Sequence, residues 1–383
     1  MNLQFSIEEN RFRDEVRTWL AENKPRESRP VHGDAMVEYD RAWQRRQYDA
    51  GWAGIAWPKE YGGRGLSLIE QLIWFEEYAR AGAPTIGVFY VAVNHGGPTL
   101  IARGSEEQKA FHLEKILRGE AVWSQGFSEP GAGSDLASLR ARAEIDGDHL
   151  VVNGQKIWTT YGQYSQYQEL LVRTDPAVPK HKGISWVICD MDTPGIDVCP
   201  IECMDGSEHF CEVFYNDVRI PLGNVVGGMN NGWATAMATL GFERGTAALA
   251  DQIELAGVVD ELIELARHRG VLGIDDIGAN LAKLKAEVMA LRAMGYATIS
   301  RALHTDVPGA EATMISLFMT EANQRVHRVA MDILGMDNVE RPATSEGLQG
   351  RYLTSFMQTI GGGTSEIRRN IIGERVLGLP KSK

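Results

Sequence analysis

The sequence predicts a mainly helical chain, with a central β domain between an N-terminal helical domain and a C-terminal up-and-down helix bundle. Apolar residues recur at helical spacing up to about residue 120, alternate with a period of two from about 121 to 225, and then return to helical spacing. The length of 383 residues also exceeds one usual domain. We therefore expect domains at residues 1–120, 121–225 and 226–383.

Helix start signals recur in the N-terminal part. Ser6 can cap a helix whose apolar residues continue at helical spacing over 14–20. A second helical run covers 68–81, and Ser105, between a glycine and two glutamates, is typical of an N-cap with an acidic first turn. We expect the helix after Ser105 to continue toward Leu117.

Short runs with a period of two, separated by turn residues, fill the middle part. Asp146-Gly147 and Asn153-Gly154 are dipeptides that join antiparallel strands, so residues 138–161 are expected to form a meander. Further strands are predicted near 169–173, 183–191 and 209–215. At least six short strands predict a small antiparallel β barrel or sandwich.

Two long apolar stripes mark the C-terminal part. They step by three or four residues, one through Leu281, Leu284, Val288 and Leu291, the other through Ile315, Phe318, Ala322, Val326, Val329 and Ile333. Several long helices in succession predict an up-and-down bundle.

A loop of small residues, Phe127 to Asp135, precedes the strands. Its glycines let the backbone approach a flat or phosphorylated ligand, and Ser128 and Ser134 supply hydroxyls. The loop lacks the third glycine of the dinucleotide fingerprint and no strand-to-helix pattern surrounds it, so a nicotinamide-binding Rossmann unit is disfavoured. The expected meander ends in Trp158-Thr159-Thr160, an aromatic residue beside hydroxyls.

The charge balance limits the partners. A net charge of -12 disfavours nucleic-acid and anionic membrane surfaces, because both need a basic face on the protein. No apolar run of about 18 residues and no basic-then-apolar leader is present, so we expect a cytoplasmic protein with no membrane span.

The four cysteines match no zinc spacing and are expected to be reduced structural thiols, with no metal. The basic run 180–182 is expected to be a solvated loop, with a place near an anionic ligand as the alternative.

Five motifs carry a family resemblance, and their order and spacing make it specific: Gly97 to Leu100, Ser128 to Asp135, Asn153 to Thr159, Asp217 to Pro221 and Gly363 to Ile367. Over nearly its whole length, the chain resembles the acyl-CoA dehydrogenase family. The resemblance implies FAD as cofactor, an acyl-CoA substrate and an electron-transfer flavoprotein as electron acceptor. By itself, Trp158 would be a half-buried strand residue. The resemblance implies instead that it covers one face of the flavin.

The resemblance also implies which residues bind. The implied cofactor set is Gln125, Phe127, Ser128, Gly133, Ser134, Trp158, Thr160, Arg269, Thr364 and Glu366. Ser134 would also touch the pantetheine arm of the substrate. Arg244 would neutralise coenzyme A charge or hold Glu243, with a structural ion pair as the alternative.

The position of the catalytic base departs from the commonest family pattern. Many members carry a glutamate just before the Gly-Thr pair of the late loop, where this chain has Gly362. Isovaleryl- and long-chain-type members place it before an arginine on an earlier helix, as Glu243 stands before Arg244. The resemblance therefore implies Glu243 as the base for the α-proton and the backbone N–H of Gly362 as an oxyanion donor. From the local sequence alone, the alternative is that Glu243 is an acid on a helix surface, paired with a nearby cation. Glu366 is a rival base that the family pattern assigns to the cofactor.

The main hypothesis is FAD-dependent α,β-dehydrogenation of an acyl-CoA thioester to a 2-enoyl-CoA in fatty-acid or lipid catabolism. A flavin oxidase or monooxygenase on the same fold, and a non-catalytic partner subunit, are the alternatives.

Three glycines at 361–363 stand where the family's loop carries an aromatic residue and a glutamate. Their small size predicts room for branched or polycyclic acyl groups.

A tetramer is expected, with a heteromer favoured over a homotetramer. In the family, a motif Gln-x-x-Gly-Gly-x-Gly helps hold the FAD of a neighbouring subunit. The matching stretch here, Asp332 to Asn338, keeps one glycine and would place carboxylates beside a pyrophosphate. Arg269 matches a family arginine that reaches across the same interface, and it is retained.

Overall fold

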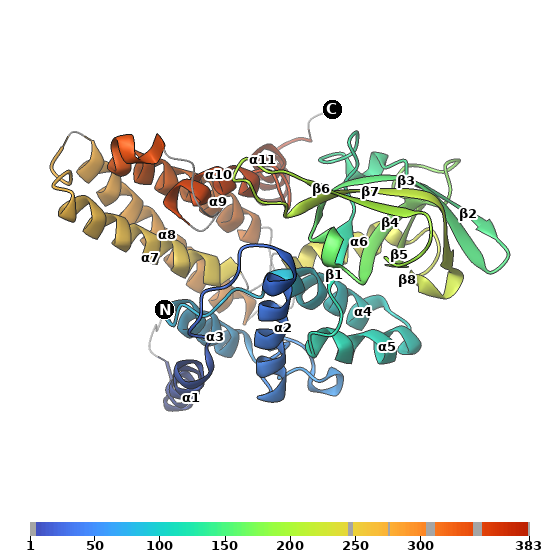
Figure 1. Ribbon diagram of the computed structural model, residues 1–383, viewed down its shortest axis with the longest axis horizontal. Helices are drawn as coiled ribbons and strands as arrows, with labels where there is room; N and C mark the ends of the chain where they lie inside the picture. The colour runs from blue at the N-terminus through green and yellow to red at the C-terminus, as the bar shows by residue number, and fades with distance from the viewer. Residues whose placement is uncertain (1–4, 244–247, 275, 304–310, 340–346, 382–383) are drawn as a thin grey trace.

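The chain folds as helices, a sheet and a second set of helices, in that order along the sequence (Figure 1). The computed structural model describes residues 5–243, 248–274, 276–303, 311–339 and 347–381. The expected fold class, mainly helical with a central β domain, is confirmed. In the described residues, no helix is both long and apolar enough to cross a membrane.

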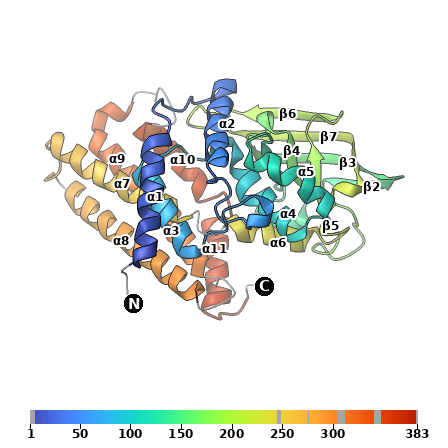
Figure 2. The same ribbon diagram turned by 90° about the horizontal axis from the view of Figure 1, so that it is seen from below.

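Capped helices form the N-terminal part, as the start signals predict. The longer ones are α1 (Ile7–Asn23), α2 (Gly33–Asp49), α3 (Leu68–Arg80), α4 (Gly97–Arg103) and α5 (Glu106–Leu117). Ser6 and Ser105 each accept a hydrogen bond from the third residue of their helix, in complete capping boxes. α3 packs against α7 (Ala248–His268), so the N-terminal helices lie across the bundle (Figure 2).

The middle part is one eight-stranded sheet in the described residues, with path order β6-β7-β3-β2-β4-β5-β8 and β1 beside β4. Its strands are β1 (Trp123–Gly126), β2 (Arg142–Asp146), β3 (His149–Thr160), β4 (Tyr167–Arg173), β5 (Ile184–Asp190), β6 (Ile196–Ile201), β7 (Phe210–Pro221) and β8 (Val225–Val226). The sheet is mixed rather than antiparallel throughout, because β4 pairs in parallel with both β1 and β2. β1, β2 and β4 run in the same direction, and β3 runs opposite to them because it pairs antiparallel with β2.

One of the two expected turns is correct and the other is wrong. Asp146 pairs with His149 at the tip of the β2–β3 hairpin, where Gly147 has a φ of 63°. Asn153-Gly154 instead lies inside β3, at a shift of register against β7. Gly154 has a φ of 152°, and a Cβ there would lie 2.6 Å from the Cα of Ala141. The glycine therefore serves a bulge with close backbone approach.

The C-terminal helices bury both apolar stripes. They are α6 (Gly232–Glu243), α7, α8 (Ile277–Ala302), α9 (Glu311–Leu334), α10 (Leu348–Gln358) and α11 (Ser365–Ile371). α7, α8 and α9 pack against one another, as expected for a bundle. Their core includes Leu281, Leu291, Ala322, Val326 and Ile333. The loop after β6 reaches this bundle, where Thr354 of α10 donates to Asp205 over 3.2 Å.

Candidate active site

The loop from Phe127 to Asp135 is fastened to β3 at its centre. The backbone N–H of Ile157 donates to the carbonyl of Ser128 over 3.0 Å. The ammonium of Lys156 donates to the carbonyl of Phe127 over 3.0 Å and to the Glu129 carboxylate over 2.9 Å. Lys156 is fully buried, and burial lowers its pKa to about 8 although the Glu129 carboxylate opposes the shift. These contacts hold Ser128 beside the residue that precedes Trp158.

Trp158 presents an indole ring to the outside from strained backbone. Its φ is 63°, in the left-handed region that bulky residues rarely adopt, and its side chain is 56% exposed. The shift of register between Lys156 and Thr159 against β7 lies at this point. Phe210 makes a T-shaped contact with the indole, with 6.0 Å between ring centroids, and Trp158 remains exposed beyond this contact. Such a ring beside the half-buried Thr160 suits contact with a flat aromatic ligand.

The other residues expected to bind the cofactor from the sheet side differ in their burial and in their hydrogen bonds. Phe127 is buried in the core, so its backbone, and not its ring, can face a ligand. Gln125 of β1 donates to Glu169 over 2.7 Å. Gly133 and Ser134 are exposed, and a Cβ at Gly133 would meet nothing within 4 Å. The segment around Gly133 is therefore open to a ligand.

The basic run 180–182 lies beside the same loop. Lys180 donates to the Asp135 carboxylate over 2.7 Å, and Asp135 follows Ser134 directly. This ion pair lowers the pKa of Asp135, with the Lys180 hydrogen bond as its main cause. The alternative expectation, a basic loop near an anionic ligand, is thus compatible with the geometry.

The late loop contributes a second group of expected residues. Thr364 caps α11 by accepting from the N–H of Ile367 over 3.2 Å, and Glu366 is exposed one position beyond the start of α11. Gly362 has a φ of 64°. The buried Arg368 donates to the carbonyl of Gly361 over 2.9 Å and so holds this loop against the helices.

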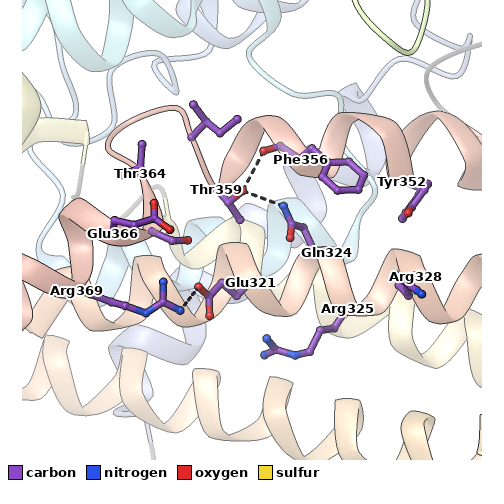
Figure 3. A pocket seen from close by; sticks show the side chains of 12 residues that line it. Glu321, Gln324, Arg325, Arg328, Tyr352, Phe356, Thr359, Thr364, Glu366 and Arg369 are labelled. Carbon is purple, nitrogen blue, oxygen red and sulfur yellow. Dashed lines mark hydrogen bonds and ion pairs between the residues drawn. The ribbon is translucent and has the colours of Figure 1, made fainter. Parts of the chain in front are cut away.

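Thr364 and Glu366 line a pocket of about 580 Å³ (Figure 3). Aromatic side chains of α10, Tyr352 and Phe356, line it together with the arginines Arg325, Arg328 and Arg369. Arg369 is held by Glu321 over 2.6 Å. Hydroxyls, aromatic rings and guanidinium groups are a donor set that fits a nucleotide with phosphates.

The expected base lies at the limit of what is described. α6 ends at Glu243, but the Glu243 side chain and the whole of Arg244 lie outside the described residues. Their roles stay predictions.

Arg269 is not part of the site around Trp158. It directly follows α7, at the end of the bundle farthest from the sheet, where α7 turns back into α8 (Figure 1). There it donates to Asp337 over 2.7 Å and to the carbonyl of Leu334 over 3.3 Å. Met336 beside Asp337 is 82% exposed. A role for Arg269 toward a cofactor requires a neighbouring subunit.

A cavity of about 2050 Å³ lies between the three parts of the chain. Tyr161 and Tyr164, just beyond β3, line its sheet side, and α7, α9 and α10 line its bundle side. The bundle wall carries Asp251, Glu254 and His327, which the sequence analysis does not single out. The i,i+3 spacing of Asp251 and Glu254 on α7 is the sequence feature that could have identified this wall. The buried Lys156 was also missed, although strand alternation places it on the inner face of β3.

Helices, a mixed sheet with a strained and exposed tryptophan, and a helix bundle define a class of three-part oxidoreductases. The models for the N-terminal, middle and C-terminal domains of acyl-CoA dehydrogenase match residues 6–120, 124–218 and 230–377. The chain belongs to the acyl-CoA dehydrogenase family, as the resemblance implies.

Relatives of known name cover the chain almost completely. The chain is 39% identical to the acyl-CoA dehydrogenase IpdE1 of Mycobacterium tuberculosis, over 97% of each chain. Among solved structures it is similar to the Tcur3481-Tcur3483 steroid ACAD, with a TM-score of 0.87, 34% identity and full coverage of both chains. It is also similar to the ChsE4-ChsE5 complex from Mycobacterium tuberculosis, with a TM-score of 0.83, 35% identity and full coverage of both chains.

Proposed function

We propose that this chain is an FAD-dependent acyl-CoA dehydrogenase that converts an acyl-CoA thioester to a 2-enoyl-CoA. The observation that carries the proposal is Trp158, an exposed indole in left-handed backbone that the buried Lys156 and the loop 127–135 hold in place. No side chain accepts a hydride, so a bound flavin would supply that chemistry. The segments 1–120, 121–225 and 226–383 would act as the three domains.

The residues around Trp158 fit the ring of the cofactor. Trp158 would cover one face, while Ser128 and Thr160 would bond to polar edges, with Gln125, Phe127, Gly133 and Ser134 along the same loop. Thr364 and Glu366 would reach the cofactor from α11, where the pocket of Figure 3 offers guanidinium groups for phosphates. The open segment around Gly133 and Ser134 would also admit the pantetheine arm of the substrate.

Glu243 would take the α-proton, and the N–H of Gly362 would donate to the thioester oxygen as negative charge develops on it. The left-handed backbone at Gly362 supports a role that needs no side chain. Arg244 would face the charge of coenzyme A or hold Glu243. Lys180, already beside Ser134 through its pair with Asp135, is positioned to help balance anionic substrate charge.

The acyl group would be large. The central cavity has about 2050 Å³, and the late loop carries three successive glycines in place of side chains. One similar solved structure is a steroid ACAD. A polycyclic or branched acyl thioester, used in lipid catabolism, is therefore the proposed substrate class.

We propose that the chain works in the cytoplasm as half of a heterotetramer and passes electrons to an electron-transfer flavoprotein. The similar structures Tcur3481-Tcur3483 and ChsE4-ChsE5 are each named as two different chains. The ion pair between Arg269 and Asp337 supports the same proposal, because it occupies an arginine that would otherwise be available to a partner's cofactor.

Rapid mixing with acyl-CoA thioesters tests the proposal. Glu243→Gln removes basicity and keeps size, so flavin reduction should slow by roughly 10²–10⁴ while FAD stays bound. Glu366→Gln is the matched control for the rival base and should slow reduction much less. A Glu243→Gln enzyme that reduces its flavin at the wild-type rate would overturn the assignment. Rapid reoxidation of the reduced enzyme by air would indicate an oxidase instead.

A further inference from the structure

The bundle wall of the central cavity is polar, although most of an acyl group is apolar. Asp251, Gln252 and Glu254 of α7, Asn323 and His327 of α9, and Arg351 of α10 all line the cavity. A wall that only had to pack hydrocarbon would gain nothing from these groups, because each loses water when an apolar ligand covers it.

Two of these side chains have buried polar atoms with no partner among the described residues. His327 is 4% exposed, and its Nδ1 lies 2.9 Å from the carbonyl oxygen of Asn323 in its own helix. A carbonyl only accepts, so Nδ1 carries the proton and Nε2 is a free acceptor directed away from that helix. Gln252, also 4% exposed, has a side-chain nitrogen without a partner. The wall thus offers one unused acceptor and one unused donor.

Desolvation favours the neutral forms of the titratable groups at this wall. Asp251 and Glu254 are exposed to the cavity, but the protein around them displaces water. This desolvation raises the pKa of Asp251 to about 7, and the charge of Glu254 adds to the shift. It also raises the pKa of Glu254, against the charge of Arg351. Burial lowers the pKa of His327, and the charge of Arg351 lowers it further. Near neutral pH, Asp251 can therefore carry a proton to donate while His327 remains an acceptor.

We propose that this wall recognises a hydroxyl or carbonyl oxygen on the acyl group, with Asp251, Gln252 and His327 as specificity-determining residues. The proposal rests on the proposed function and names a feature of its substrate. A hydroxyl would donate to Nε2 of His327 and accept from Gln252, and a ketone would accept from Gln252 and Asp251. An acyl group without oxygen would leave the buried donor and acceptor unsatisfied.

The test compares three thioesters on the FAD-loaded enzyme as purified, together with its partner chain where one is present. They are a polycyclic acyl-CoA with one ring hydroxyl, the matching ketone and the matching deoxy compound. We expect kcat/KM for the better oxygenated compound to exceed that for the deoxy compound by about tenfold or more, because sites built to hydrogen-bond a substrate reject analogues that lack the group. Equal values for all three overturn the inference and leave the proposed function intact. If none reduces the flavin, the proposed function itself fails.

Variants separate recognition from structure. Asp251→Leu and His327→Phe should bring the ratio of the two kcat/KM values toward one while activity on the deoxy compound persists. Asp251→Asn should keep most of the preference for the ketone, because an amide still donates. Glu264→Gln, an exposed carboxylate of the same helix paired with Arg267, is the matched control and should leave the ratio unchanged. Loss of activity on all compounds alike, in variants that retain FAD, shows a structural role and overturns the inference.

Discussion

Arg269 donates to Asp337 over 2.7 Å at the end of the bundle farthest from the sheet. The resemblance assigns this arginine to the cofactor of a neighbouring subunit, yet here a carboxylate of the same chain already neutralises it. Leu334 holds the same guanidinium through its carbonyl. A subunit with this contact offers a weakened half-site to its neighbour, which is the physical basis of the proposed heteromer.

Asp337→Asn should raise the FAD content of the chain produced alone. The pair is partly exposed, and such pairs are worth about 0.2–1 kcal/mol, so freeing Arg269 should strengthen FAD binding by about 1.4- to fivefold. The ratio of flavin to protein absorbance after gel filtration measures this. Asp337→Glu keeps the charge and is the control. A wild-type homotetramer that already holds one FAD per chain would contradict the heteromer.

The fold class was accessible from sequence because its signals are local. Ser6 and Ser105 cap helices through contacts three residues away, and Asp146-Gly147 forms a hairpin within its own residues. Asn153-Gly154 carries the same signal but forms a bulge, because β3 continues against β7. The parallel pairing of β1 with β4 joins distant segments, and no local pattern encodes it.

The candidate site also has some parts that local sequence motifs predict and others that depend on contacts between distant segments. Trp158 and the loop at Ser128 were identified by motif, but their support by the buried Lys156 depends on a contact across the sheet. The polar cavity wall joins α7 to α9, and only the packing of the bundle brings Asp251 and His327 to one cavity. Helical spacing alone cannot show which distant helix faces which.

Lys156→Met should destabilise the protein and loosen the cofactor. Removing one partner of a buried ion pair costs about 3–5 kcal/mol, because Glu129 would remain buried and charged. The free energy of unfolding in denaturant and the FAD content measure the two effects. Lys180→Met is the control, since its partly exposed pair with Asp135 at the other end of the loop should cost about 0.2–1 kcal/mol. Similar losses for both variants would show that burial of Lys156 does not matter.

The same lysine predicts a dependence on pH. Burial lowers the pKa of Lys156 to about 8 from 10.5 in the unfolded chain, so between these values the unfolded state holds more protons. The stability of the wild type relative to Lys156→Met should therefore rise with pH across this window, by up to about 3 kcal/mol. Unfolding free energies of both proteins from pH 7.5 to 10.5 check the sign. A difference that stays flat or falls contradicts the prediction.

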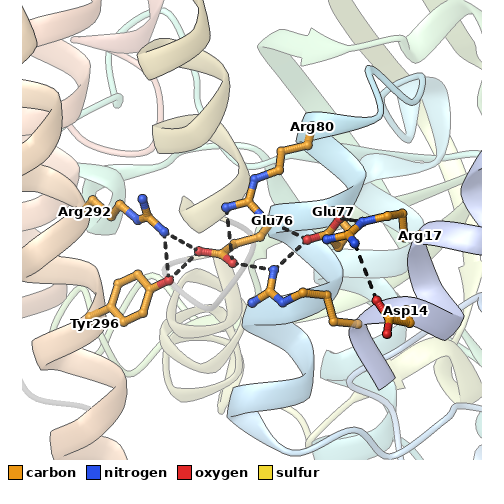
Figure 4. A network of polar contacts seen from close by, with 8 residues as sticks. Asp14, Arg17, Glu76, Glu77, Arg80, Arg292 and Tyr296 are labelled. Carbon is orange, nitrogen blue, oxygen red and sulfur yellow. Dashed lines mark hydrogen bonds and ion pairs between the residues drawn. The ribbon is translucent and has the colours of Figure 1, made fainter. Parts of the chain in front are cut away.

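Glu76→Gln should weaken the attachment of the N-terminal helices to the bundle (Figure 4). Glu76 of α3 accepts from Tyr296 of α8 over 2.5 Å and pairs with Arg292 over 3.3 Å. Arg13 of α1 pairs with both Glu76 and Glu77, so it would keep one partner. We expect a loss at the lower end of the about 3–5 kcal/mol for broken buried pairs.

Thermal and denaturant unfolding measure this loss, with Asp14→Asn as the control. Asp14 belongs to the same network but is exposed and 3.4 Å from Arg17, so its replacement should change stability by no more than about 0.5 kcal/mol. Equal effects of the two variants would indicate that the network acts only as surface charge.

Gly362→Ala should reduce both stability and turnover, whereas Gly361→Ala should be tolerated. Gly362 has a φ of 64°, and a residue with a Cβ in left-handed backbone costs about 1–2 kcal/mol. A glutamate at 362, the commonest family base position, would meet the same strain, which agrees with a base elsewhere in this chain.

At Gly361 no positive φ occurs, and an added Cβ would lie 3.5 Å from the carbonyl oxygen of Met357, an ordinary contact. Because Arg368 holds the carbonyl of Gly361, strain at 362 cannot relax freely and should displace the N–H proposed to face the thioester. Unfolding free energy and the rate of flavin reduction should therefore fall together in Gly362→Ala, and equal behaviour of the two variants would remove Gly362 from the proposed site.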